Sequence, residues 1–156
     1  METQNFFFID RDIDEGLFND FSAFLIKAEN NYSVVHLLFN STGGKMLFAA
    51  KIIKLMIKSG IEFQGIAIGK VSSATIPIFL ATSNRRGVVQ SSALIHRASK
   101  ENEDFSIEEI AIMERQFLEY IAQKLELLID EVYEMADAKT VITIDHPLGK
   151  KFFTGN

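Results

Sequence analysis

Three short polar segments of the chain follow apolar runs and carry residue types that can perform acyl transfer. The run at 34–39 leads into a turn that contains Gly43, and a later run ends at the serine pair Ser72 and Ser73. A third run, at 92–96, ends on His96. A hydroxyl group needs a nearby base before it attacks a carbonyl carbon, and imidazole is the commonest base in proteins. These residues would together form a site for nucleophilic attack on an acyl group.

Ser73 is the candidate nucleophile because it follows a predicted strand and begins a predicted helix. In that position the N–H of Ala74 would face a developing oxyanion, and Gly43 could supply a second N–H. The alternative is that Ser72 and Ser73 only cap the helix. His96 likewise is either the base or a structural histidine whose ring is hydrogen-bonded within the fold. Spacing alone leaves both questions open.

A carboxylate is expected to orient the base, and the sequence offers Asp145 and Asp137, both beyond the long helical segment. Lys70 lies three residues before Ser73 and could act as its base in a serine–lysine pair. The alternative is that Lys70 is an ordinary surface lysine. The spacing of ligand residues indicates no metal site, and no cofactor is expected. The remaining histidines, His36 and His146, are assigned no catalytic role.

Composition narrows the class of protein. The chain has 156 residues, which predicts a single domain over 1–156, and 47% of them are hydrophobic. The net charge of −5 without a basic cluster argues against a nucleic-acid partner. There is no cysteine and no apolar run of about 20 residues, so we expect neither disulfides nor a membrane span. Cytoplasm is the expected location. The 14 phenylalanines favour burial of apolar surface between copies of the chain.

The hydrophobic pattern predicts an α/β fold in which crossover helices connect buried parallel strands. A turn is predicted at 84–87, and a charged loop is predicted at 100–106. Ser106 is expected to cap one long helix at 107–136, which would span about 45 Å. The other predicted strands lie at 6–10, 34–39, 64–69, 87–90 and 92–96, and the other predicted helices at 14–29, 46–60 and 73–83.

Taken together, these segments resemble the proteolytic subunit of the Clp protease, the ClpP family. NSTGG (40–44) is similar to the family's N-S-P-G-G turn, and IGKVSSAT (68–75) to its I-G-x-A-A-S-M-G motif. The segment from Arg85 to His96 is similar to the family's R-to-M-I-H segment, and 107–136 resembles its handle helix. The resemblance covers about residues 5–145.

The resemblance implies a ClpP/crotonase-like stack of β-α-β units and a serine peptidase that acts on polypeptides. Ser73 would be the nucleophile, His96 the base and Asp145 the third triad member. Gly43 and Ala74 would form the oxyanion hole, and Gly44 would contact substrate. Family members assemble as rings, heptameric and often stacked in pairs, and receive unfolded chain from an AAA+ unfoldase.

The sequence also departs from the family pattern. Thr42 replaces the proline of the turn, Ala74-Thr75 replaces Met-Gly, and HRAS (96–99) replaces H-Q-P. The acidic segment KENEDF (100–105) stands where the family has a glycine-rich strand that pairs with substrate. The loss of the glycine-rich strand favours one alternative to the peptidase, a catalytically inactive scaffold or regulatory subunit. A second alternative is a crotonase-type enzyme acting on acyl-CoA, because paired backbone N–H groups on the same fold could equally hold a thioester enolate.

Overall fold

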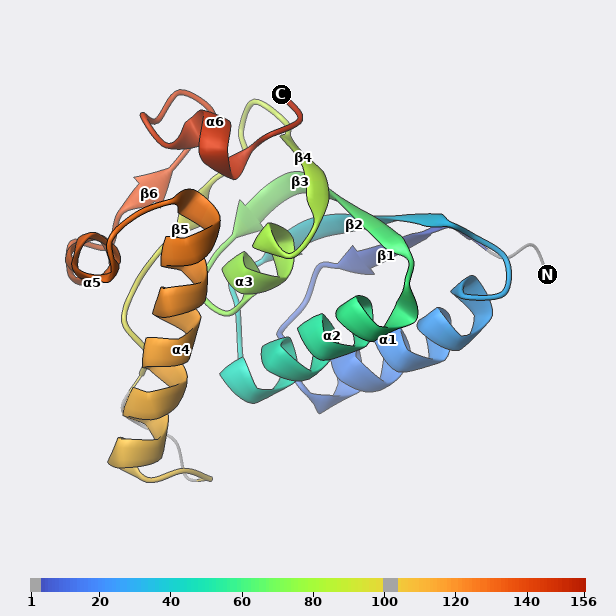
Figure 1. Ribbon diagram of the computed structural model, residues 1–156, viewed down its shortest axis with the longest axis horizontal. Coiled ribbons are helices and arrows are strands. Elements are labelled where there is room, and N and C mark those ends of the chain that lie inside the picture. Colours follow the sequence, from blue (N-terminus) through green and yellow to red (C-terminus); the bar gives the residue numbers. More distant parts are fainter. Residues whose placement is uncertain (1–3, 100–103) are drawn as a thin grey trace.

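A four-stranded parallel sheet forms the centre of the computed structural model, which describes residues 4–99 and 104–156 (Figure 1). The strands are β1 (Phe6–Ile9), β2 (Val34–Ser41), β3 (Glu62–Val71) and β4 (Ser83–Gly87), and they lie in that order across the sheet. Neighbouring strands pair in parallel throughout. Parallel pairing requires crossover connections, so the predicted α/β class with stacked β-α units is confirmed.

Three helices make these crossovers: α1 (Glu15–Ala28), α2 (Met46–Ser59) and α3 (Thr75–Leu80). Asp14 caps α1 through its side chain, and α2 ends at Gly60 in the left-handed conformation predicted for a C-terminal glycine. In Figure 1, α1 and α2 lie side by side against one face of the sheet, and they contact each other.

Phenylalanine supplies much of the packing between these layers. Phe21 lies between α1 and the sheet, and Phe39, Phe79, Phe152 and Phe153 are fully buried together. The rings of Phe79, Phe152 and Phe153 are in mutual contact at centroid distances of 4.9–5.8 Å. The C-terminal helix α6 (Gly149–Phe152) is thereby fixed to the core.

Two local predictions about the middle of the chain were wrong. Residues 84–87, predicted as a turn, belong to strand β4, and of the strand predicted at 87–90 only Gly87 is in a strand, as the last residue of β4. Burial of Arg85 and pairing with β3 override the turn-like composition of Asn84 to Gly87. The strand predicted at 92–96 is shortened to β5 (Ala93–Leu94), which pairs antiparallel with β6 (Val141–Ile142). Within the predicted loop at 100–106, residues 100–103 lie outside the described part.

The helix predicted at 107–136 is interrupted. It consists of α4 (Ile107–Leu125) and α5 (Ile129–Asp137), with Glu126 in the left-handed conformation between them. The Glu131 side chain accepts a hydrogen bond from the Leu128 N–H, and this bond caps the N-terminus of α5. Ser106 caps α4 as predicted, in a capping box with Glu109. Figure 1 shows α4 extending away from the sheet.

No helix in the described ranges is long and apolar enough to cross a bilayer.

The last residues of the chain cover the outer edge of β4. The Gly155 N–H donates to the Arg85 carbonyl at 2.7 Å. The Asn156 side chain accepts from the Gly87 N–H at 2.9 Å and donates to the Gly87 carbonyl at 3.0 Å. An amide side chain thus makes the two bonds that a neighbouring strand would make.

The buried side chain of Arg85 binds this C-terminal segment to the sheet. Its guanidinium donates to the carbonyls of Phe152 at 2.7 Å, Lys151 at 2.8 Å and Thr82 at 3.0 Å. Burial lowers the pKa of Arg85 from its ordinary value. The planar, five-donor group satisfies carbonyls from two segments at once, which a lysine cannot reproduce.

Replacing Arg85 should therefore destabilise the fold. We expect Arg85→Lys to lower the free energy of unfolding by about 2–3 kcal/mol, because buried carbonyls lose their donors. The neighbouring Arg86 is exposed, so Arg86→Lys is the matched control and should change stability by less than about 0.5 kcal/mol. Chemical denaturation of both variants at equal protein concentration measures the difference. Equal stabilities would contradict the anchoring role.

Candidate active site

The carboxyl ends of three strands meet at one place and carry the candidate site. In the β2–β3 ladder Ser41 is paired with Val71, and the Ser72 N–H donates to the Ser41 carbonyl at 3.1 Å. The Ser73 N–H donates to the Leu94 carbonyl at 3.0 Å. The turn that follows β3 is therefore bonded to the last residue of β2 and to the last residue of β5.

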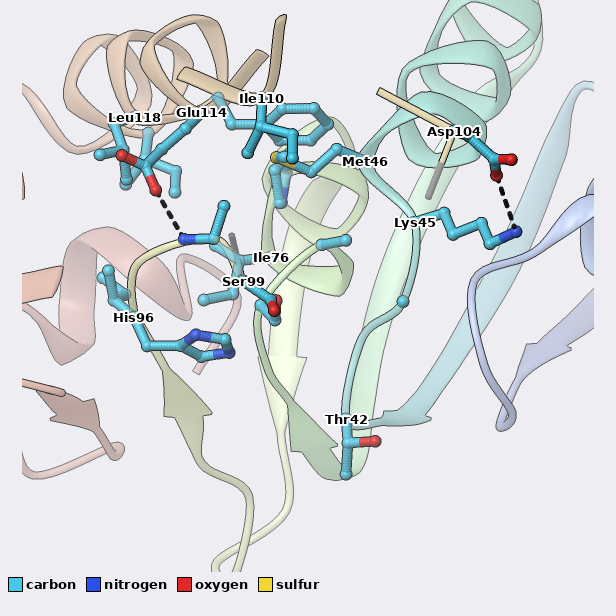
Figure 2. A pocket seen from close by; sticks show the side chains of 18 residues that line it. Thr42, Lys45, Met46, Ile76, His96, Ser99, Asp104, Ile110, Glu114 and Leu118 are labelled. Carbon is cyan, nitrogen blue, oxygen red and sulfur yellow. Dashed lines mark hydrogen bonds and ion pairs between the residues drawn. The ribbon is translucent and has the colours of Figure 1, made fainter. Parts of the chain in front are cut away.

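These turns line a cavity of about 520 Å³ (Figure 2). Ser73, Ala74, Gly44 and His96 all contribute to its wall, so the structure brings the candidate nucleophile and base to one space. The apolar part of the wall comes mainly from α2, α3 and α4, through Met46, Ile76, Pro77, Ile110, Phe117, Leu118 and Ile121. Such a wall suits an apolar side chain of a ligand whose reacting group lies at the serine.

Ser73 has a backbone conformation that residues other than glycine rarely adopt, with φ of +55°. It lies between the end of β3 and the start of α3, where a sharp turn exposes the hydroxyl. The N-cap of α3 is Ala74, and no side chain caps the helix. The alternative that Ser72 and Ser73 serve as helix caps therefore finds no support in the structure.

Gly43 lies against Ser73 so closely that only glycine fits. A Cβ atom placed on Gly43 would lie 2.6 Å from the Ser73 Cβ and 3.2 Å from the Ala74 nitrogen. Gly43 also has φ of +111°, which other residues avoid. The glycine turn and the serine turn are thus in direct backbone contact.

The N–H groups around this contact differ in their availability. The Gly43 N–H, predicted as an oxyanion donor, donates instead to Ser41 Oγ at 3.2 Å. Gly44 is exposed and lines the cavity, and a Cβ there would collide with Ile13. Among the hydrogen bonds of the described residues, the N–H groups of Gly44 and Ala74 have no partner. These two groups are the better candidates for binding an oxyanion.

His96 follows β5 and is half-buried at the cavity wall, where Figure 2 shows its ring extending toward the middle of the view. Its Nδ1 lies 2.7 Å from the carbonyl oxygen of Arg97. Because a carbonyl can only accept, this contact assigns the proton to Nδ1. Nε2 then carries the lone pair that a general base needs.

None of the other sequence candidates forms a hydrogen bond or ion pair with this ring among the described residues. Asp145 is exposed, does not line the cavity, and makes no hydrogen bond or ion pair within the described ranges. Asp137 accepts from Arg97 at 3.0 Å. Lys70 is exposed and is not among the residues that line the cavity.

Sequence reasoning missed two features of the cavity. Glu114 reaches from α4 to the Ala98 N–H and to Arg97, as Figure 2 shows for the former. Its position four residues from both Ile110 and Leu118, within a buried stripe, was an available signal. Lys45 and Asp104 approach to 3.8 Å at the wall, and both side chains are more than half exposed. No pattern in the sequence linked Lys45 to Asp104.

Comparisons with known proteins agree with this architecture. A family model described as Clp protease matches residues 1–148. The structure of ClpP1 from Listeria monocytogenes aligns with a TM-score of 0.84 at 20% identity, covering 95% of this chain and 86% of that one. A mutant of the same ClpP1 gives the same values. The ClpP protease catalytic domain from Plasmodium falciparum aligns at 0.81 and 15% identity, covering 96% and 81%. No curated protein sequence is detectably similar.

The contact between the two turns can be tested through Gly43. We expect Gly43→Ala to destabilise the protein more than Gly60→Ala, by about 1–3 kcal/mol, because the added methyl group collides with Ser73. Gly60 also has positive φ but has open space around it, so it reports backbone strain alone, about 1–2 kcal/mol. Denaturant titrations give both values, and equal losses would show that the turns are not in contact.

Proposed function

Because the chain belongs to the Clp protease family, we propose that it is a serine peptidase with Ser73 as nucleophile and His96 as general base. Its substrates are polypeptides, and the apolar cavity receives the side chain next to the bond that is cut. One observation carries the proposal. Two residues from different strand ends line one cavity, and the serine sits on a strained turn that serves no capping purpose.

The chemistry follows from the positions of the groups. Ser73 Oγ attacks the carbonyl carbon of the peptide bond while its proton passes to His96 Nε2. The oxyanion that forms is bound by the N–H groups of Ala74 and Gly44, each worth about 3–4 kcal/mol in such a role. His96 then gives the proton to the leaving amine, and the C–N bond breaks. Water repeats the sequence on the acyl-enzyme and restores the Ser73 hydroxyl.

The third triad role stays a prediction. The resemblance assigns it to Asp145, whereas the resting partner of His96 Nδ1 is the Arg97 carbonyl. For Asp145 to orient the ring, its carboxylate would have to displace that carbonyl. Measuring the Ser73 labelling rate of Asp145→Asn tests this assignment.

We also propose that the chain acts as a homo-oligomeric ring fed by an AAA+ unfoldase, as its family does. The outer surface of α4 presents large apolar residues, including Ile107 and Ile112 at 66% and 60% exposure, and Leu128 follows at 73%. Such residues are expected where copies of a chain pack together.

The two alternatives make different demands on the site. An inactive scaffold would need the assembly surface but not the serine. A crotonase-type acyl-CoA enzyme would need an available carboxylate near the oxyanion donors. Among the residues that the structure describes, the carboxylates of the cavity wall are Glu114 and Asp104, which form ion pairs with Arg97 and Lys45. The peptidase is therefore favoured over the acyl-CoA enzyme.

A fluorophosphonate probe should label the wild-type protein at Ser73, and Ser73→Ala should abolish labelling. Peptidase activity should fall at least about 1,000-fold, because the nucleophile is lost. Ser72→Ala and Ser99→Ala are matched controls, since Ser72 is the neighbouring residue and Ser99 lines the same cavity. Both should retain labelling. Mass spectrometry of the labelled peptide reads the site.

Equal labelling of wild type and Ser73→Ala would refute the nucleophile assignment. A wild-type protein that assembles but is never labelled would favour the inactive scaffold. Thermal stabilisation by acyl-CoA would favour the crotonase-type alternative.

A further inference from the structure

The peptide group between Arg97 and Ala98 has a hydrogen-bonded partner on each side. On one side its carbonyl oxygen lies 2.7 Å from His96 Nδ1. On the other side its N–H donates to Glu114 Oε2 at 2.6 Å, a contact visible in Figure 2. A trans peptide group is planar and directs its C=O and N–H in opposite directions. Glu114 and the His96 ring therefore lie at opposite ends of a single peptide dipole.

We propose that Glu114 is the carboxylate that positions His96, and that it acts through the 97–98 peptide group. This inference rests on the proposed role of His96 as general base. In a serine hydrolase the orienting acid fixes the imidazole tautomer and stabilises the imidazolium. Here the Glu114 carboxylate performs both tasks without touching the imidazole, because the 97–98 peptide group lies between them. Glu114 is a positioning residue, because it touches neither substrate nor the reacting atoms.

The electrostatics favour such a relay. The Glu114 side chain is 11% exposed, so water screens its charge little. A negative charge beyond the N–H polarises the peptide and increases the negative charge on the carbonyl oxygen. That oxygen then binds the Nδ1–H more strongly, most of all when His96 has gained a second proton. During the reaction the proton of Ser73 moves to Nε2, while Nδ1 keeps its proton and none passes to Glu114.

Arg97 holds the carboxylate in this orientation. Its Nε and one terminal nitrogen both lie 2.8 Å from Glu114 Oε1, which leaves Oε2 for the peptide N–H. The other terminal nitrogen bonds Asp137 on α5 at 3.0 Å, and the guanidinium lies 4.8 Å from the Tyr133 ring centre. Contacts to two helices thus fix the residue whose carbonyl binds His96.

The test compares Glu114→Ala and Asp145→Asn with Glu108→Ala as control, since Glu108 is exposed on the same helix. Nitrogen-15 NMR of the ring nitrogens reads the tautomer of each of the three histidines, and a His96→Gln spectrum identifies the relevant signals. We expect neutral His96 to hold its proton on Nδ1 in wild type, Glu108→Ala and Asp145→Asn. In Glu114→Ala the proton should be shared between both nitrogens.

The labelling rate of Ser73 should follow the tautomer. We expect Glu114→Ala to lose about 10- to 100-fold, because the base is misplaced. The control Glu108→Ala should stay within about threefold of wild type, and Asp145→Asn should lose less than Glu114→Ala. Loss of labelling in Asp145→Asn together with an unchanged Glu114→Ala would overturn the proposal and assign the role to Asp145. A proton on Nε2 in wild-type His96 would overturn it as well.

A double variant separates positioning from folding if Glu114→Ala is too unstable to study. Arg97→Met with Glu114→Leu replaces the ion pair by apolar side chains of similar length, which proteins often tolerate. If it melts near the wild-type temperature, we expect the tautomer and labelling defects to persist. A folded double variant with wild-type labelling would reduce the pair to a structural role. A wild-type protein that shows the Nδ1 tautomer but no labelling would refute the proposed function and leave the contact intact.

Discussion

The contact between the Gly43 turn and the Ser73 turn is the constraint on which the site depends. Two backbones can approach this closely only where one residue lacks a Cβ, and the same contact positions the N–H groups on either side of the serine. The parallel sheet supplies the framework, because it brings the ends of β2 and β3 to one edge. The strain at Ser73 is held by bonds to two neighbouring strands, from Ser72 to Ser41 of β2 and from Ser73 to Leu94 of β5.

The second half of the site is built differently. His96 follows a strand of only two residues, β5, which alone would hold it weakly. Its position is secured by packing against α4 and α5, through Glu114, Arg97 and Asp137. The serine side of the cavity is thus fixed by main-chain contacts within the sheet layer, and the histidine side by charged contacts to helices. Any shift of α4 would move the base relative to the nucleophile.

The sequence was informative where chemistry follows local pattern. Ser73 and His96 were predicted at strand ends and both lie there, Ser73 after the parallel strand β3 and His96 after β5, which pairs antiparallel with β6. The break at Glu126 was not predictable, since the apolar spacing continues from α4 into α5. Strand β4 was mistaken for a turn because the partners of Arg85 are carbonyls at Lys151 and Phe152, far along the chain. Glu114 was recognisable only as an acid within an apolar stripe.

Because the edge of β4 is covered, a further strand could be added to the four-stranded sheet only at its other edge. Asn156 occupies the main-chain groups of Gly87, and Gly155 those of Arg85, so an incoming strand finds its bonding positions taken. Of the two outer strands of the four-stranded sheet, β1 is therefore the one whose edge stays open to main-chain pairing among the described residues, and it carries the exposed side chain of Phe8. A sheet continued into another polypeptide would extend from the N-terminal strand outward and never from the opposite margin.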